Sequence, residues 1–285
     1  MKKIIILISF IPSALFAQPI NKKLQKSVEA LVKNYKGDIG VYIQSLKTGK
    51  VVQINADTVF PTASIVKVPI LIGIINKIKQ GELSFHQEFA YHDSMLYAGV
   101  DMLGSFKNGE KIELSKLIML MLSMSDNTAS LWLQKLAGTG TVINELIDKN
   151  GFKYTRVNSK TVGREDKRTQ YGWGQTTPKE MASILEKMYR GEIINDSLSK
   201  KMIRLLGRNY WDEEALSEIP ATIFVASKSG AVDASRSEIL LVMAKEPYIL
   251  SVFTKNNTDT SWNYTNEAWV LIRKLSNISY SYFSK

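Results

Sequence analysis

The sequence predicts an α/β fold of the α+β type, in which an antiparallel sheet built from both ends of the chain packs beside an inserted helical lobe. β-rich runs occupy 39–46 and 51–55 near the start and 222–227, 238–243 and 248–253 near the end. Helical periodicity dominates the residues between these runs. Helical patterns also lie outside the strands at both ends of the chain, so we expect two terminal helices to cover the sheet.

Residues 1–17 predict an export signal. Lys2 and Lys3 form a basic start, 4–15 is an apolar stretch too short to span a bilayer comfortably, and Phe16-Ala17-Gln18 offers a cleavage point. An uncleaved amphipathic anchor is the alternative. Cleavage lowers the net charge from +10 to 10 − 2 = +8. Because the basic residues are scattered, we expect no nucleic-acid partner. With the signal removed, we expect a periplasmic or secreted protein that has no stable membrane span and is a monomer.

The next elements follow from apolar periodicity. A first helix is expected over 24–35, and Lys47-Thr-Gly-Lys50 predicts a hairpin turn between the first two strands. The segment 64–79 is apolar on nearly every face, which a helix tolerates only when it is buried on all sides. Two further helices are expected over 114–122 and 128–136.

A long segment, 154–175, has no periodic apolar face and is predicted to be an irregular loop. Ordered loops of this length inside a compact domain are usually functional. It ends where Thr177-Pro178-Lys-Glu180 supplies a helix start, and Gly191 closes that helix. A last helix is expected over 262–275.

We therefore expect one catalytic domain over 18–285. Its sheet lobe comprises 18–62 and 218–285, and its all-α lobe comprises 63–217. A cleft between two such lobes is where a small-molecule site belongs.

Composition limits the chemistry of that site. The 285 residues contain no cysteine and only two histidines, His86 and His92. Thiolate nucleophiles, disulfides and zinc–cysteine or iron–sulfur sites are therefore excluded, and we expect neither a metal nor an organic cofactor. A nucleophile has to be serine, threonine, lysine or a carboxylate.

Three short motifs occur in order: Ser64-Ile-Val-Lys67, Ser125-Asp-Asn127 and Lys228-Ser-Gly230. The first and third patterns recur at Ser197-Leu-Ser-Lys200 and Lys47-Thr-Gly49, so each is weak alone. Context distinguishes them, because only the first motif opens a strongly apolar helix. Read alone, the second motif is a helix N-cap and the third is a strand end before a turn.

The physical case rests on Ser64 and Lys67. A serine at a helix start faces unpaired N–H groups that stabilise an oxyanion. Lys67 lies one turn further along the same face, and burial would lower its pKa until the neutral amine can accept the serine proton. A second lysine, Lys228, would favour that shift and attract a substrate carboxylate.

With their flanking residues, these motifs resemble the serine β-lactamase and penicillin-binding protein superfamily, and most closely the class A β-lactamases. The flanks are Phe60-Pro before the nucleophile, Thr176-Thr-Pro178, and Ser235-Arg236 after the third motif. The resemblance covers essentially the whole mature chain. It implies a β-lactamase/transpeptidase-like fold.

The resemblance also implies roles for individual residues. Ser64 would be the nucleophile that forms the acyl-enzyme, Lys67 its proton partner, and Ser125 the proton relay to the leaving nitrogen. The backbone N–H groups of Ser64 and Ala231 would form the oxyanion hole. The substrate would be bound by Asn127, Lys228, Ser229, Gly230, Ala231, Arg236 and the cleft-wall aromatic Tyr97.

One family feature is absent. Class A enzymes activate the deacylating water with the glutamate of a Glu-x-x-Leu-Asn loop, and 154–175 contains no such motif. An ungapped alignment places Thr161 at the glutamate position. Glu165 and Asp166 are the only carboxylates there, and Glu165 either holds the water or is a surface charge.

These observations leave three functions open. The leading one is an exported serine hydrolase that opens the β-lactam ring. The alternative is a D,D-peptidase, or a slowly deacylating penicillin-binding or sensor protein, acting on the D-Ala-D-Ala of peptidoglycan stem peptides. The third is a binding module that kept the fold without the chemistry.

Overall fold

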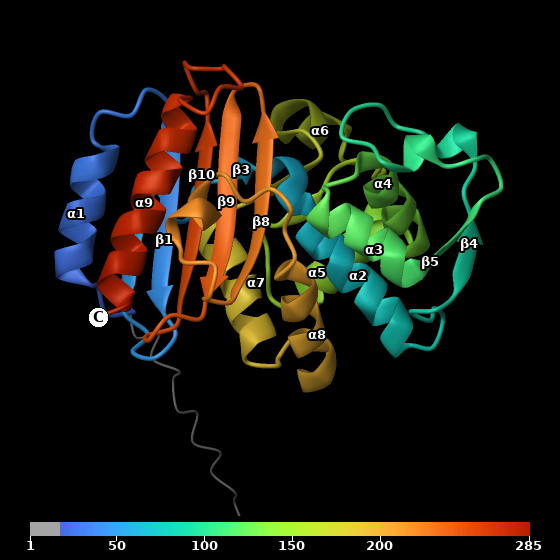
Figure 1. The fold of residues 1–285 in the computed structure, drawn as a ribbon, viewed down its shortest axis with the longest axis horizontal. Helices are drawn as coiled ribbons and strands as arrows, with labels where there is room; N and C mark the ends of the chain where they lie inside the picture. The colour runs from blue at the N-terminus through green and yellow to red at the C-terminus, as the bar shows by residue number, and fades with distance from the viewer. Residues whose placement is uncertain (1–17) are drawn as a thin grey trace, which may run out of the picture.

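A five-stranded antiparallel sheet organises the structure, a computed structural model that describes residues 18–285. Its strands run in the order β2 (Val51–Ile54), β1 (Asp38–Ser45), β10 (Tyr248–Lys255), β9 (Ser235–Val242) and β8 (Val225–Val232). The pairing of β1 with β10 joins the two ends of the chain (Figure 1). The predicted fold class is confirmed. The predicted signal segment, 1–17, lies outside the described residues.

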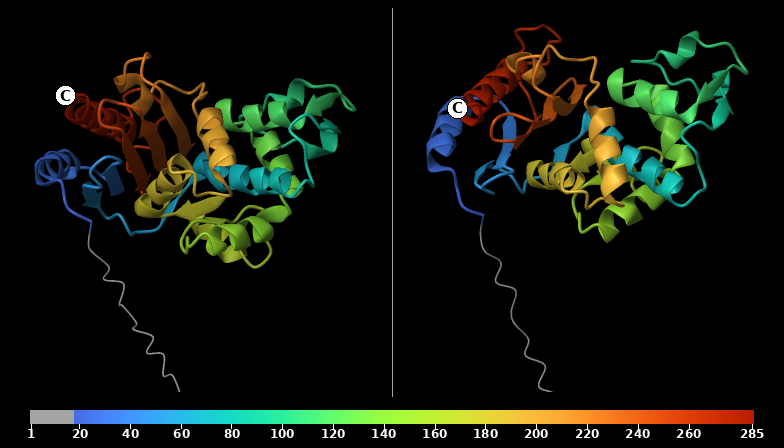
Figure 2. Two further views of the ribbon diagram at one scale, coloured as in Figure 1. Left: turned by 90° about the horizontal axis from the view of Figure 1, so that it is seen from below. Right: turned by 60° about the horizontal axis from the view of Figure 1, so that its bottom comes forward.

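Two helices cover one face of the sheet. α1 (Lys22–Val32) and α9 (Glu267–Phe283) lie side by side there (Figures 1 and 2). Val41, Leu240 and Val252 point from the strands into the apolar core beneath these helices. Neighbouring strand residues face the opposite core, as the two-residue period of a strand requires.

The other face of the sheet packs against the remaining helices. α7 (Pro178–Tyr189) contacts β1 and β10, and α2 (Lys67–Lys79) occupies the centre of the helical part. Every residue of α2 from Lys67 to Ile75 is buried, so the expected all-round burial is confirmed. The further α-helices of this part are α3 (Leu114–Ser123), α4 (Asn127–Leu136), α5 (Thr139–Lys149), α6 (Glu165–Tyr171) and α8 (Asp196–Leu206).

The inserted segment 63–217 is not all-α, which corrects the predicted description of that lobe. It contains the strand pair β4 (Glu88–Ala90) and β5 (Lys111–Glu113), and also β6 (Arg156–Val157) and β7 (Gly174–Thr176), which join β3 (Phe60–Pro61) in a small sheet. Such short strands leave no period-two pattern in a sequence. The domain boundaries themselves stay a prediction.

The segment 154–175 is more regular than expected, because it holds α6 as well as β6 and β7. α6 has no buried residue and therefore leaves no apolar periodicity in the sequence. α5 and α8 also have no counterpart among the predicted elements. The second copy of the Ser-x-x-Lys pattern, which begins at Ser197, lies in the first turn of α8.

Several predicted boundaries differ from the structure. Ser64 lies in a 3-10 turn, Ala63–Val66, and the α-helix begins only at Lys67. The Lys228 motif lies within β8, which continues to Val232 instead of ending at 227. The last helix begins at Glu267 and not at 262, because the Asn266 side chain caps it.

None of the helices within residues 18–285 has the length and apolar character needed to cross a bilayer.

Candidate active site

Ser64 lies where the edge strand of the sheet meets the turn before the central helix. β8 is that edge strand, and a Cβ atom at its Gly230 would lie 2.5 Å from the Thr62 carbonyl oxygen and 3.0 Å from the Ser64 backbone nitrogen. A larger residue would push β8 away from Ser64, so the glycine permits the close approach. The predicted oxyanion hole, formed by the N–H groups of Ser64 and Ala231, depends on this approach.

Lys67 connects the first two motifs. Its Nζ lies 3.1 Å from Ser64 Oγ, 3.0 Å from Ser125 Oγ and 3.1 Å from Asn127 Oδ1. It also donates to the Ser125 carbonyl oxygen at 2.5 Å, and its side chain has no exposed surface. Three of the predicted site residues, Ser64, Ser125 and Asn127, therefore surround the amine of a fourth, Lys67.

Two buried lysines face this junction. Burial holds the pKa of Lys67 well below its usual range, and the positive charge of Lys228 lowers it further, whereas Asp126 raises it. Burial also lowers the pKa of Lys228 to about 8, against the opposing effect of Glu238. The neutral amine of Lys67 can therefore accept a proton, while Lys228 keeps most of its charge below pH 8.

The backbone of the second motif is strained and firmly held. Ser125 has a φ of 60°, in the left-handed region. The next residue, Asp126, accepts a hydrogen bond from the Ala129 N–H at 2.6 Å, which confirms its N-cap role for α4. Its other oxygen accepts from the N–H groups of Met102 and Leu103, at 2.5 and 3.1 Å. One buried carboxylate thus ties two segments to Ser125.

An open cavity of about 560 Å³ lies over Ser64. Of the predicted site residues, Ser64, Tyr97, Asn127 and Ala231 line it directly. Lys67, Ser125, Lys228, Ser229 and Gly230 are not part of the lining; the Lys228 ammonium donates to the Ser229 carbonyl oxygen at 2.9 Å.

An aromatic pair forms part of the cavity wall. The rings of Tyr97 and Trp173 meet edge to face, with centroids 5.1 Å apart. The Tyr97 N–H donates to Thr128 Oγ1 at 2.9 Å, which fixes this segment to α4. Tyr97 therefore lies in the cavity wall beside Trp173, and its role in substrate binding stays a prediction.

The model of a family described as "Beta-lactamase enzyme family" matches residues 23–283. The chain belongs to the β-lactamase enzyme family. The predicted resemblance is confirmed. Among curated relatives, β-lactamase VEB-1 of Pseudomonas aeruginosa is 24% identical over 297 residues, covering 98% of this chain and 97% of the relative.

Solved structures agree with the fold. The structure of PBP-A superposes with a TM-score of 0.82 at 20% identity, covering 93% of this chain and 97% of PBP-A. A variant of PBP-A, solved as an acyl-enzyme complex with penicillin G, gives a TM-score of 0.81 at 21% identity, covering 93% and 98%.

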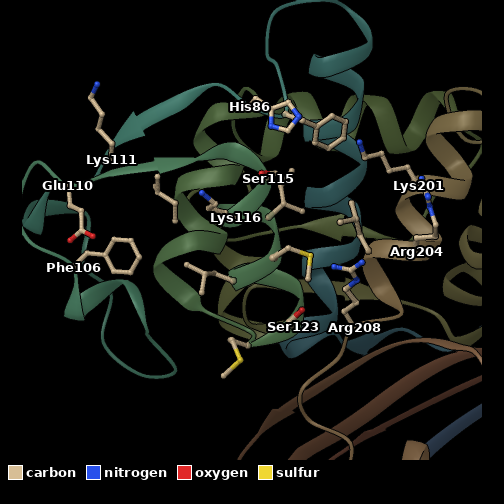
Figure 3. Close-up of a pocket in the computed structure, with 17 residues that line it drawn as sticks. His86, Phe106, Glu110, Lys111, Ser115, Lys116, Ser123, Lys201, Arg204 and Arg208 are labelled. Carbon is tan, nitrogen blue, oxygen red and sulfur yellow. The ribbon is translucent and has the colours of Figure 1, made fainter. Parts of the chain in front are cut away.

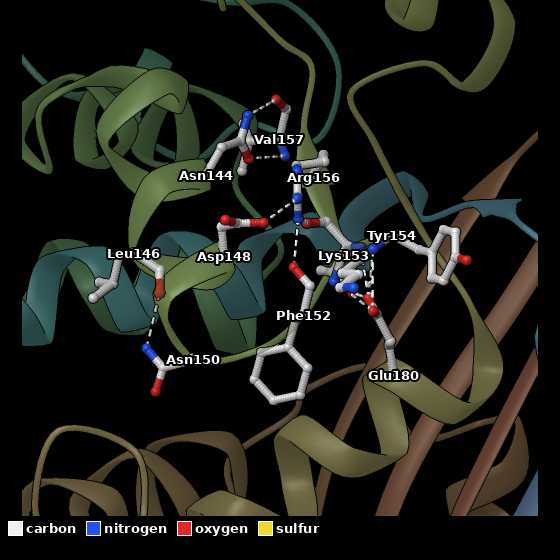
Figure 4. A network of polar contacts seen from close by, with 11 residues as sticks. Asn144, Leu146, Asp148, Asn150, Phe152, Lys153, Tyr154, Arg156, Val157 and Glu180 are labelled. Atoms are coloured by element: carbon white, nitrogen blue, oxygen red, sulfur yellow. Dashed lines mark hydrogen bonds and ion pairs between the residues drawn. The ribbon is translucent and has the colours of Figure 1, made fainter.

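The segment before the cavity wall is anchored in this β-lactamase-family chain by a polar network (Figure 4). Asn144 of α5 makes two hydrogen bonds with the Val157 backbone, at 2.9 and 2.7 Å, and Arg156 pairs with Asp148 at 2.7 Å. The Glu180 carboxylate of α7 accepts hydrogen bonds from the backbone N–H groups of 153–155. These contacts fix the start of the segment against α5 and α7.

Neither candidate for the family glutamate lines the cavity. Glu165 is exposed in the first turn of α6, where it accepts a hydrogen bond from the Gly163 N–H at 3.2 Å. Thr161 is buried against α5, and its hydroxyl donates to the Ser159 carbonyl oxygen at 2.9 Å. Within the described residues, no aspartate or glutamate lines the cavity. The geometry favours the surface-charge interpretation of Glu165.

Arg236 also lies outside the cavity, which corrects its expected position. Its guanidinium lies on the α9 side of the sheet, 4.3 Å from the Trp262 ring centroid. It donates to the Val232 carbonyl oxygen and to those of Ser235 and Ser261, at 3.0 and 2.8 Å. The Arg236 guanidinium therefore stabilises the β8–β9 turn through these hydrogen bonds.

Sequence reasoning assigned no binding role to most of the cavity lining, including Gln170, Trp173, Lys255 and Asn256. Gln170 and Trp173 belong to 154–175, so the length of that segment pointed to function without identifying individual residues. Lys255 ends β10, Asn256 follows it, and neither belongs to a motif. They reach the cavity through the pairing order of the sheet, which no local pattern encodes.

Proposed function

We propose that this protein is a serine hydrolase that β-lactams acylate at Ser64 and that then hydrolyses the acyl-enzyme. The observation that carries the proposal is the position of the buried Lys67 amine, within hydrogen-bond distance of both Ser64 Oγ and Ser125 Oγ. Membership of the β-lactamase enzyme family supports it.

Acylation follows from this geometry. Neutral Lys67 accepts the Ser64 proton as Ser64 Oγ attacks the β-lactam carbonyl carbon. Negative charge then develops on the carbonyl oxygen, beside the N–H groups of Ser64 and Ala231. When the carbon–nitrogen bond of the ring breaks, Ser125 donates its proton to the leaving nitrogen and regains one from the Lys67 ammonium.

Substrate placement uses the residues around these groups. Lys228 supplies positive charge for the substrate carboxylate from behind the cavity lining, and Ser229 adds a hydroxyl beside it. The Asn127 side chain holds the substrate amide. Tyr97 and Trp173 form the aromatic surface against which the acyl side chain packs.

A second candidate differs only in the final step. Within the described residues no carboxylate lines the cavity, so no side chain of that kind is positioned to activate the deacylating water. This favours slow deacylation, as in a penicillin-binding protein or a D,D-peptidase acting on peptidoglycan stem peptides. The acyl-enzyme complex with penicillin G solved for the PBP-A variant gives the same fold a precedent for a penicillin adduct.

Export is the third part of the proposal. The apolar stretch behind Lys2 and Lys3 supports cleavage near Ala17 and a periplasmic or secreted location. We expect a monomer, which gel filtration of the mature protein would test.

Intact-mass spectrometry after mixing with benzylpenicillin separates the candidates. An adduct that forms and decays within seconds identifies a β-lactamase. One that persists for hours identifies a penicillin-binding protein, and release of D-Ala from muropeptides would then establish the peptidase. If no adduct forms, the acylation mechanism is wrong and a binding module with this fold remains.

A further inference from the structure

A second cavity lies on the helical side of the molecule, between α3 and α8 (Figure 3). Its volume is about 890 Å³, and it shares no lining residue with the cavity over Ser64. We call it the α3–α8 groove; its walls come from these two helices and from 85–86, 106, 110–112, 124 and 208. Neither the proposed chemistry nor the family motifs use it.

The floor of the groove is apolar. Ile118 and Leu120 of α3, Leu205 of α8, and the rings of Phe85 and Phe106 contribute to it. All but Ile118 are partly exposed. A ligand that removes apolar surface of a concave site from water lowers the free energy, so the floor favours an apolar ligand.

The rim of the groove is strongly basic. Lys111, Lys116, Lys201, Arg204 and Arg208 line it, with Glu110 as the one carboxylate among the lining residues, a balance of 5 − 1 = +4. In the part of the chain that the structure describes, Lys201, Arg204 and Arg208 form no salt bridge. These three lie along one side of the groove (Figure 3).

Two further contacts or groups characterise the groove: a cation against its aromatic floor and a buried hydroxyl. The Lys201 ammonium lies 3.4 Å from the Phe85 ring centroid, so positive charge meets the apolar surface directly. The Ser123 hydroxyl, at the end of α3, is buried and has no hydrogen-bond partner within residues 18–285. A polar atom of this kind inside a groove can bind the polar end of a ligand.

We propose that the α3–α8 groove binds a single-chain anionic amphiphile of the long-chain carboxylate class. The alkyl chain covers the apolar floor, and the carboxylate meets Arg204 and Arg208, which present guanidinium groups suited to that shape. Charge complementarity decides the class. A neutral alkyl chain would leave the cations unused, and a polar glycan would leave the floor uncovered.

Fluorescence titration of the purified protein with cis-parinaric acid, an 18-carbon polyene carboxylate, tests the proposal. We expect saturable 1:1 binding, and at least about tenfold weaker binding of the uncharged methyl ester. Arg204→Gln/Arg208→Gln should weaken binding of the acid by a similar factor. The matched control is Lys22→Gln/Lys26→Gln, which removes two charges from exposed positions of α1 and should leave affinity unchanged.

The competing outcomes are distinct. Equal affinities for acid and ester, or equal losses in the two double variants, would overturn the proposal because binding would then not depend on the rim. No saturable binding of the free acid, with binding only to vesicles of phosphatidylglycerol, would also overturn it and would assign the basic rim to a membrane surface. Unchanged melting temperatures of both double variants exclude unfolding as the cause of lost binding.

Discussion

Gly230 approaches Ser64 so closely that a Cβ atom on the glycine would lie 3.0 Å from the Ser64 backbone nitrogen. The contact joins the edge strand of the sheet to the turn that carries the proposed nucleophile. Its consequence is that the width of the gap between β8 and Ser64 depends on the absence of one side chain.

Gly230→Ala should therefore slow acylation. The added methyl also meets the Thr62 carbonyl oxygen at 2.5 Å, so β8 has to move, and small displacements of reacting groups are costly. We expect the rate constant for acylation by benzylpenicillin to fall by about tenfold or more. Stopped-flow kinetics measure it, with the melting temperature as a check on folding, and an unchanged rate would show that the spacing is not limiting.

Ser64→Ala should abolish the covalent adduct with benzylpenicillin. Within the described residues the Lys67 amine contacts the hydroxyls of Ser64 and Ser125, and of these two residues only Ser64 lines the cavity. Ser197→Ala is the matched control, since Ser197 opens the same four-residue pattern on an exposed part of α8. Intact-mass spectrometry reads both variants. An adduct on the Ser64 variant would assign the nucleophile elsewhere.

The acylation rate should fall as the pH rises through about 8. Lys228 is charged below its lowered pKa of about 8 and neutral above it, so its attraction for the substrate carboxylate weakens on the alkaline side. Lys67 acts in the opposite sense, because it has to be neutral, but its pKa lies well below the usual range.

Lys228→Arg tests this assignment. An arginine stays charged to high pH, so the alkaline decline should disappear from the profile of second-order acylation rate constants up to pH 10, whatever the effect on the absolute rate. If the decline persists in the variant, another group is responsible for it.

Deacylation should respond to Gln170 and not to Glu165. Glu165→Gln should leave the lifetime of the benzylpenicillin adduct unchanged, because Glu165 is exposed and outside the cavity. Gln170→Glu places a carboxylate on the cavity wall, and general-base catalysis should shorten the lifetime by about tenfold or more. A longer-lived adduct in Glu165→Gln would restore the water-holding role to that residue.

Glu238→Gln should make stability less dependent on pH. Burial raises the pKa of Glu238 from 4.5 to about 8, so the stabilisation by its protonated form is complete below pH 4.5 and is lost as the pH rises toward 8. Glutamine stays neutral throughout. Between pH 5 and 8 the unfolding free energy of the parent should fall by up to about 3 kcal/mol more than that of the variant. Urea unfolding measures these free energies, and an equal change in the parent and the variant between pH 5 and 8 would contradict the prediction.

Sequence reasoning was most reliable where a residue acts through its neighbours along the chain. Ser64 and Lys67 are three positions apart, and their 3.1 Å contact follows from the turn that joins them. The contact of Lys67 with Ser125 required the known order of motifs in the family. The position of Arg236 could not be predicted, because it depends on the Trp262 ring and on carbonyl groups brought together by the β8–β9 turn.

The same distinction applies to the fold. α2 was recognisable because its residues are apolar on every face, and the strands of the large sheet because each is a β-rich run. α6 was not, because none of its residues is buried. Strands β3, β6 and β7 form through contacts between distant segments, which leave no periodic trace in two or three residues.

The pairing of β1 with β10 has a consequence for synthesis of the chain. Ser45 pairs with Tyr248, so β1 can pair with β10 only after most of the helix-forming segments have been synthesised. Local helical contacts form fast, whereas this closure needs nearly the whole chain. Until β10 has been synthesised, β1 can pair only with β2 in this sheet, and its other edge is open to pairing with other chains.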